Sequence, residues 1–118
     1  MTYIRVRNKT RNVDLGQKIW IANSLRDRAV GLLSTNALGS GEGLLLSPCK
    51  SIHTFFMRFP IDVLFLDPQG IVLAQKTYKP WRLSGWYRKA DGVLELSAGT
   101  IERTKTQLGD RLDLMDLK

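Results

Sequence analysis

Short stretches of the chain alternate between hydrophobic and polar residues, as half-buried β-strands do. The alternation is clear at residues 3–7 and 111–115, and a further strand is expected at 18–22 around Trp20. Short apolar runs bounded by turn residues predict buried strands at 44–46, 52–57, 61–66, 71–77 and 93–96. About eight short strands with turns between them favour a β-sandwich or barrel.

Two segments follow the helical period instead. Residues 24–33 place leucine and alanine side chains on one helical face, and Ser24 is a suitable N-cap. Residues 100–108 are expected to form a second short helix, with Thr100 able to cap its start. Gly109 then suits the left-handed position that follows many helices. The pattern therefore predicts a mainly β fold with two short helices.

Turn residues place the loops. The tetrapeptide Asp67-Pro68-Gln69-Gly70 has proline and glycine where a β-turn favours them, so the strands on either side should form a hairpin. Residues 36–43 are rich in glycine and serine and should be a loop. Residues 78–91 form a longer loop with aromatic and basic side chains, and loops of this length are often functional.

Length and composition indicate one soluble globular domain over residues 1–118. The chain has 118 residues, and 43% of them are hydrophobic. No apolar run approaches the ~18 residues that a membrane helix needs, so no membrane association is expected. The N-terminal residues are charged and lack the apolar centre of a signal peptide, so we expect the protein in the cytoplasm.

The chain contains one cysteine, Cys49, and one histidine, His53. No internal disulfide can form, and these residues do not supply the ligands of a zinc site, so we expect no metal and no cofactor. A catalytic thiolate needs an adjacent base and a group that orients it, and the sequence shows no third residue for that role. The sequence also lacks the glycine-rich phosphate motifs and the nucleophile-elbow motif.

The net charge of +7 is spread along the chain. A basic surface attracts phosphates, nucleic acids or acidic partners. Because the charge is the main support for nucleic-acid binding, we keep that function as a less favoured alternative.

Four segments, in order along the chain, resemble the bacterial and archaeal domain of unknown function family 192. The central one is SIHTFFMRFPIDVLFLD at 51–67, and the others are RAVGL at 28–32, VLELSAGT at 93–100 and GDRL at 109–112. The resemblance covers about residues 17–114. It implies a jelly-roll-like β-sandwich with small helical insertions, and it implies no activity.

Two departures from the family pattern stand out. The more common family motif F-W-M-K-N-T is Phe-Phe-Met-Arg-Phe-Pro here, at 55–60, and a family proline is replaced by Ser97. Neither departure alters the expected fold. The first one changes the surroundings of Met57.

Two carboxylates lie in otherwise apolar strands. Asp62 follows Pro60-Ile61, and Glu95 lies between two leucines. A buried carboxylate must find hydrogen-bond donors or an opposite charge, so either residue could be held structurally by arginine or backbone groups. Alternatively, both could open into one cleft and work as an acid and a base.

Arg58 and Arg82 are candidate partners for these carboxylates, or alternatively a clamp for an anionic ligand. His53 is a structural residue or a ligand contact. Trp81, together with the aromatic residues at 86–87, anchors the long loop or stacks on a ligand.

The sequence favours a small non-enzymatic binding module on a β-sandwich, with a small ligand or a protein as its partner. The alternatives are an enzyme that uses Asp62 and Glu95, and a nucleic-acid binder. We expect the site where residues 52–62 meet the loop around Trp81. The candidate site residues are His53, Arg58, Asp62, Trp81, Arg82 and Glu95.

Overall fold

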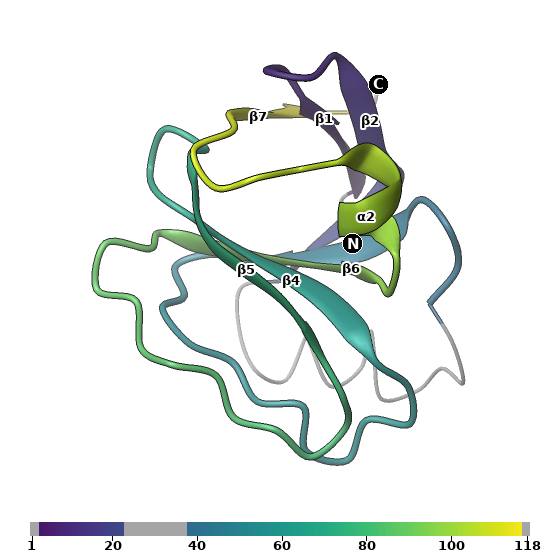
Figure 1. Ribbon diagram of the computed structural model, residues 1–118, viewed down its shortest axis with the longest axis vertical. Helices are drawn as coiled ribbons and strands as arrows, with labels where there is room; N and C mark the ends of the chain where they lie inside the picture. Colours follow the sequence, from purple (N-terminus) through teal and green to yellow (C-terminus); the bar gives the residue numbers. More distant parts are fainter. Residues whose placement is uncertain (1–2, 23–37, 117–118) are drawn as a thin grey trace.

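The computed structural model describes residues 3–22 and 38–116 (Figure 1). Within these residues, seven strands form one sheet in the order β5-β4-β6-β3-β2-β1-β7. The pairing of β2 with β3 is parallel, whereas the other neighbours are antiparallel. The strands are β1 Tyr3–Asn8, β2 Val13–Ala22, β3 Glu42–Leu46, β4 Ile61–Leu66, β5 Val72–Tyr78, β6 Gly92–Ser97 and β7 Leu112–Asp116.

The sheet curls until its two edge strands meet at one end. Ile71 and Arg111, which precede β5 and β7, form an antiparallel bridge, and the Leu112 amide donates to the carbonyl of Gly70 at 2.9 Å. Gly70 has φ +82°, and a Cβ there would lie 2.5 Å from the Leu112 carbonyl oxygen, so this approach requires glycine. The predicted mainly β, partly open barrel fold is confirmed.

The two faces of the sheet carry separate hydrophobic clusters. Along β4, Val63 and Phe65 belong to one cluster, while Leu64 and Leu66 belong to the other, as the period of two requires. All six residues of β4 are buried, which explains its continuous apolar sequence. The cluster that contains Val63 also includes Ile52 from the segment before β4, so the chain outside the strands covers this face.

The hairpin between β4 and β5 forms as predicted. The Gly70 amide donates to the Asp67 carbonyl at 3.0 Å, which closes the turn. The carboxylate of Asp67 accepts from the amides of Gln69 and Ile71, at 2.8 and 2.9 Å. An aspartate at the start of a turn commonly makes such bonds to the backbone that follows it.

The predicted strand at 52–57 is wrong. This segment makes a single bridge, between His53 and Leu83, and turns at Phe55 and Phe56. Phe56 has φ 67°, a left-handed conformation that a strand does not contain. The Met57 amide then donates to the Thr54 carbonyl at 3.2 Å, which closes the turn.

The helix α2, Thr100–Thr104, is shorter than the predicted 100–108. Lys105 follows it with φ 56° and ends the helix, so Gly109 belongs to a separate turn. Gly99 occupies the N-cap position, and Thr100 is the first helical residue rather than the cap. The predicted helix at 24–33 lies outside the described residues.

No helix in the described part of the chain has the length and the apolar character needed to span a membrane.

Candidate functional site

Two loops, residues 47–60 and 79–91, lie side by side at the lower end of the view in Figure 1. The buried residue Thr54 joins them. Its amide donates to the Arg82 carbonyl at 2.8 Å, and its own carbonyl accepts from the Trp81 amide at 2.9 Å. Its hydroxyl donates to the Lys79 carbonyl at 2.6 Å and accepts from the Arg82 amide at 2.8 Å. One threonine therefore fixes the backbone of both loops.

Aromatic rings from the two loops stack on one another above Thr54. Phe55 lies between His53, at a centroid distance of 4.8 Å, and Trp81, at 5.9 Å. Phe56 also packs against Trp81 in a tilted arrangement, with ring centroids 4.7 Å apart. We call His53, Phe55, Phe56, Trp81 and Leu83 the aromatic surface.

The aromatic surface faces solvent. The exposed fractions are 66% for Phe56, 56% for Trp81 and 70% for Leu83, the residue that is bridged to His53. Large apolar side chains that cluster in the open are uncommon on monomeric proteins and mark interaction sites.

Phe56 and Trp81 also hold an unfavourable backbone conformation. Their φ angles are 67° and 64°, in the left-handed region that bulky residues rarely occupy. Each such residue costs on the order of 1 kcal/mol and persists only where neighbouring contacts impose it. Here the Thr54 bonds impose it, and both strained residues present their rings at the surface.

The two loops that carry the aromatic surface are rich in positive charge. Between residues 50–60 and 79–91 the only carboxylate in the sequence is Asp91, against six lysine and arginine residues. Lys50 is directed inward, because its ammonium group donates to the carbonyls of Arg88 and Ala90 at 2.8 and 2.7 Å. The other five cations are exposed: Arg58, Lys79, Arg82, Arg88 and Lys89.

Asp62 is buried, and both of its carboxylate oxygens accept hydrogen bonds. Its carboxylate accepts from the Thr77 hydroxyl at 2.6 Å and from the amides of Gly99 and Ile101 at 3.1 and 2.8 Å. Neither Arg58 nor Arg82 is among its donors, so Asp62 does not form the arginine pair that was expected for it. The Arg82 guanidinium instead reaches backbone carbonyls of its own loop. Asp62 therefore holds the turn that begins α2.

Glu95 is also buried, on the other face of the sheet. In the pairing of β4 with β6, Glu95 lies opposite Val63, whereas Asp62 lies opposite Leu96. Directly paired residues share a face and consecutive residues alternate, so the two carboxylates point to opposite sides. They cannot open into one cleft as an acid and a base.

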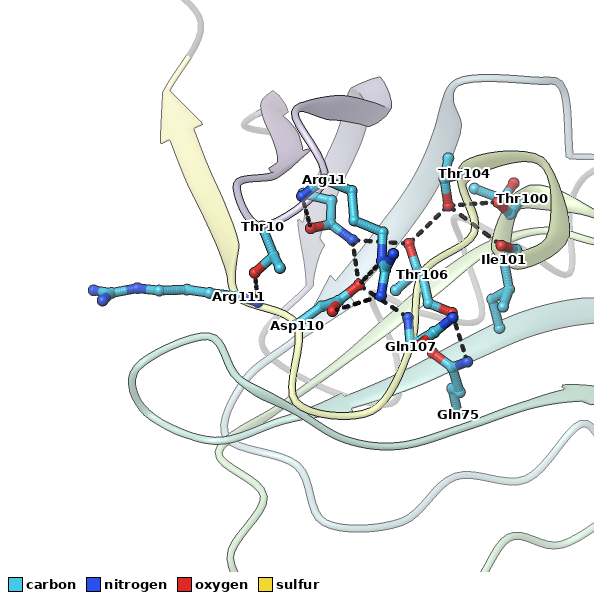
Figure 2. A network of polar contacts seen from close by, with 11 residues as sticks. Thr10, Arg11, Gln75, Thr100, Ile101, Thr104, Thr106, Gln107, Asp110 and Arg111 are labelled. Carbon is cyan, nitrogen blue, oxygen red and sulfur yellow. Dashed lines mark hydrogen bonds and ion pairs between the residues drawn. The ribbon is translucent and has the colours of Figure 1, made fainter.

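A second cluster of polar residues surrounds the buried carboxylate of Asp110, where the end of β1 meets the segment between α2 and β7 (Figure 2). Asp110 accepts from Arg11 Nε at 2.6 Å, from Asn8 Nδ2 at 3.0 Å and from the Gln107 amide at 3.0 Å. Asn8 also donates to Thr106 Oγ1 at 3.1 Å, which extends the network.

The environment of Asp110 sets its charge. Burial by itself raises the pKa of this carboxyl, but the hydrogen bonds from Arg11, Asn8 and Gln107 outweigh it and leave the pKa below its ordinary value. Asp110 is therefore ionised and saturated with donors. This arrangement stabilises the fold and leaves no open position for a ligand.

Tyr78 lies beneath the start of the 79–91 loop. Burial, followed by the nearby Tyr87, raises the pKa of the Tyr78 phenol, so this residue stays neutral at physiological pH. In the described part of the chain, histidine, cysteine and carboxylate side chains form no group of three or more that could hold a metal ion.

Sequence reasoning identified some of this site and missed the rest. His53, Trp81 and Arg82 lie together on or beside the aromatic surface, whereas Asp62 and Glu95 are in the sheet and Arg58 is an exposed residue of the first loop. Thr54, Phe55, Phe56 and Leu83 were missed. The departure from the family motif at 55–60 was the available signal, because it places two phenylalanines in succession.

The comparisons with known proteins agree with the fold. The model of the domain of unknown function family 192, described as "Uncharacterized ACR", matches residues 5–114. The chain is 32% identical to the UPF0127 protein PH1112 of Pyrococcus horikoshii, covering 89% of this chain and 94% of that protein. A UPF0127 protein of Pyrococcus abyssi is 31% identical, with coverages of 90% and 93%.

Two solved structures have the same fold. A protein of Sinorhizobium meliloti 1021 superposes with a TM-score of 0.78 at 24% identity, covering 97% of this chain and 96% of that chain. A protein of unknown function from Novosphingobium aromaticivorans superposes with a TM-score of 0.75 at 18% identity, with coverages of 93% and 82%. The chain belongs to the domain of unknown function family 192, as its sequence motifs indicated.

Proposed function

We propose that this chain is a small, non-enzymatic binding module and that the aromatic surface is where its small ligand or protein partner binds. The observation that carries the proposal is the exposure of Phe56, Trp81 and Leu83 in one cluster with stacked rings. Exposed aromatic side chains that are rigidly held supply large contact area at low entropic cost on binding.

The strained backbone of Phe56 and Trp81 supports the proposal. A left-handed conformation costs stability, and at these two residues it presents a ring to solvent rather than burying one. The four bonds of Thr54 fix both loops before any ligand arrives, so the surface is pre-organised.

The candidate residues divide into two roles under this proposal. His53, Trp81 and Arg82 contact the ligand, and Arg58 lies near enough along its loop to add charge to the same face. Asp62 and Glu95 support the sheet beneath. Asp62 does so by holding α2.

The test compares the wild type with the variant Phe56→Ser/Trp81→Ser, each purified freshly and measured by native mass spectrometry against its denatured mass. We expect the wild type to carry a bound molecule that the variant lacks. Leu108→Ser is the matched control, because Leu108 is 62% exposed but lies outside both loops. A bound molecule that is retained by the double variant contradicts the assignment of the site.

An unliganded wild type favours the protein-partner form of the proposal. A photo-cross-linking amino acid at position 81 or 108 then tests it in cells of the source organism. We expect one discrete adduct from position 81 and none from position 108. Equal adducts from both positions, or none from either, contradict a partner at the aromatic surface.

Nucleic-acid binding is a second candidate. Aromatic rings among cations can stack bases while the cations track phosphates, and the Sinorhizobium meliloti structure is described as a candidate transcription regulator. A gel-shift assay with single-stranded DNA and RNA at low ionic strength tests it. Salt-sensitive binding that Trp81→Ser weakens favours this function, and the absence of any shift removes it.

We also propose that the protein acts in the cytoplasm, because a chain with a single cysteine contains no internal disulfide, as is usual for proteins of reducing compartments. Cell fractionation with an antibody against the protein tests this location.

A further inference from the structure

A cleft of about 290 Å³ opens beside the aromatic surface, where β5 ends and the second loop begins. The residues that line it come from one continuous stretch that includes the last three residues of β5. They are Lys76, Thr77, Tyr78, Lys79, Arg82 and Leu83. Its volume suits a small molecule rather than a polymer.

Three cations and no carboxylate line this cleft. None of Lys76, Lys79 and Arg82 forms an ion pair with any residue that the structure describes. Asp62 accepts from the Thr77 hydroxyl and from the amides of Gly99 and Ile101, and it forms no ion pair with these cations. Since like charges in one cleft repel each other, an anion that binds there relieves the repulsion.

The positions of these cations are partly set before binding. The Lys76 ammonium lies over the ring of Tyr78, 5.4 Å from its centroid. The Arg82 guanidinium donates to the carbonyls of Pro80 and Trp81 at 3.3 and 3.4 Å. A stronger acceptor can replace both contacts, because the two Arg82 hydrogen bonds are long and a cation–π contact at an exposed lysine is weak.

The cleft and the aromatic surface share a wall. Leu83 lines the cleft, is 70% exposed and is bridged to His53, which stacks on Phe55. Arg82, another lining residue, directly follows Trp81. Because Leu83 belongs to both the cleft and the aromatic surface, a ligand with an anionic group in the cleft can place an apolar group on Leu83.

We propose that this cleft is an anion subsite of the aromatic surface and that the ligand is a small organic phosphate with a flat apolar group. This inference rests on the proposed function and names the ligand class for it. A phosphate dianion matches a cleft with several cations better than a single carboxylate does, and the guanidinium fork of Arg82 suits its oxygens.

Three probes test the inference: phenyl phosphate, inorganic phosphate and phenol, each titrated into the ¹⁵N-labelled chain by NMR. We expect phenyl phosphate to bind at least tenfold more tightly than either of the other two. The largest shifts should fall on the amides of residues 76–83. Equal affinities for phenyl phosphate and inorganic phosphate overturn the proposed apolar contact.

The decisive variants form a matched pair. Lys79→Gln/Arg82→Gln removes two charges from the cleft, whereas Lys9→Gln/Arg111→Gln removes two exposed charges from elsewhere in the chain. Figure 2 shows the Arg111 side chain extending away from its neighbours. We expect the first variant to bind phenyl phosphate at least tenfold more weakly and the second to bind within twofold of wild type. Equal losses in both variants mean a non-specific charge effect and overturn the subsite.

Two comparisons separate the possible failures. If Phe56→Ser/Trp81→Ser weakens phenyl phosphate binding but Lys79→Gln/Arg82→Gln does not, the cleft proposal fails and the aromatic surface stands. If neither variant changes the binding, both proposals fail. The single variants Lys79→Gln and Arg82→Gln, each expected to lose several-fold affinity, replace the double variant if its NMR spectrum shows that it does not fold.

A phosphate group can also belong to a lipid. Sedimentation with phosphatidylcholine vesicles that contain phosphatidic acid distinguishes this source. Binding to the vesicles without binding to phenyl phosphate overturns the soluble ligand. Binding to phenyl phosphate without sedimentation supports it.

Discussion

The Asp110 network and the aromatic surface reverse the usual distribution of side chains in opposite ways: the first buries polar groups and the second exposes apolar ones. Around Asp110, the polar residues Asn8, Thr106 and Asp110 are buried, and both oxygens of the central carboxylate accept hydrogen bonds from protein groups. On the aromatic surface, large apolar rings are exposed. Figure 1 places α2, β1 and β7 at one end of the molecule and the two loops at the other.

The two regions therefore serve different purposes: the Asp110 network stabilises the fold, and the aromatic surface is available for binding. Buried polar groups stabilise a fold only while every partner is present, because an unsatisfied one costs its full desolvation energy. Exposed rings contribute little to stability, since solvent already contacts most of their surface. Substitutions near Asp110 should therefore lower the free energy of unfolding, while substitutions on the aromatic surface should mainly change what the protein binds.

The largest effect is expected from Asp110→Ala. It leaves Asn8 Nδ2 and the Gln107 amide without their acceptor and Arg11 without its opposite charge. We expect a loss of about 3 kcal/mol in the free energy of unfolding, measured by urea denaturation. Glu102→Ala, which removes an exposed carboxylate of α2, is the control and should cost less than about 0.5 kcal/mol. Equal losses in both variants contradict the structural role of the network.

A smaller effect is expected from Thr54→Val, which sharpens the comparison because Thr54 is the buried polar residue beneath the aromatic surface. Valine keeps the shape but leaves the Lys79 carbonyl and the Arg82 amide unpaired. We expect a loss of about 2 kcal/mol in urea denaturation and weaker ligand binding together. Thr54→Ser keeps the hydroxyl and should retain both properties. If Thr54→Val binds ligand as tightly as the wild type does, Thr54 does not position the rings.

A third prediction concerns acid. The pKa of Asp110 is held below the ordinary value of 3.8, so its stabilising effect is complete above that pH and is lost as the pH falls through the lower folded-state pKa. We expect the urea midpoint of the wild type to fall as the pH is lowered below about 4. Asp110→Asn should flatten this dependence.

The flattening should be partial, because hydrogen bonds from Arg5 lower the pKa of Asp14 in the same direction and outweigh the opposing effect of its burial. An acid dependence that is unchanged in Asp110→Asn contradicts the assignment to Asp110.

The smallest effect on stability is expected from Phe56→Asn. Asparagine tolerates the left-handed conformation that Phe56 adopts, and this gain offsets the lost contact with Trp81. We expect the free energy of unfolding to stay within about 0.5 kcal/mol of wild type while binding of phenyl phosphate weakens several-fold. A large loss of stability instead shows that the exposed ring supports the fold.

Much of the sheet could be predicted from the sequence. The run at β4 is continuously apolar because both faces of that strand are buried, and the Asp67–Gly70 turn has residues with strong local preferences. The segment 52–57 was predicted as a strand because its apolar pattern resembles one. The pattern cannot show that tertiary bonds of Thr54 hold Phe56 in a left-handed turn.

In the candidate site too, some residues could be predicted from the sequence and others depended on the tertiary structure. Trp81 and Arg82 could be identified because a long loop of aromatic and basic residues is unusual in itself. The roles of Asp62 and Glu95 could not, since the pairing register of β4 with β6 decides which face each residue occupies. A shift of one residue would have placed the carboxylates on the same side.

The sequence by itself determined the mainly β fold, the hairpin and the family, because these follow from local turn preferences, burial patterns and motifs. The tertiary structure decided that the two edge strands meet and that Asp62 holds α2. It also brought rings from residues 53–56 and 81 into one exposed cluster beside a basic cleft. The physical reason is that these features depend on contacts between segments distant along the chain, which no local pattern encodes.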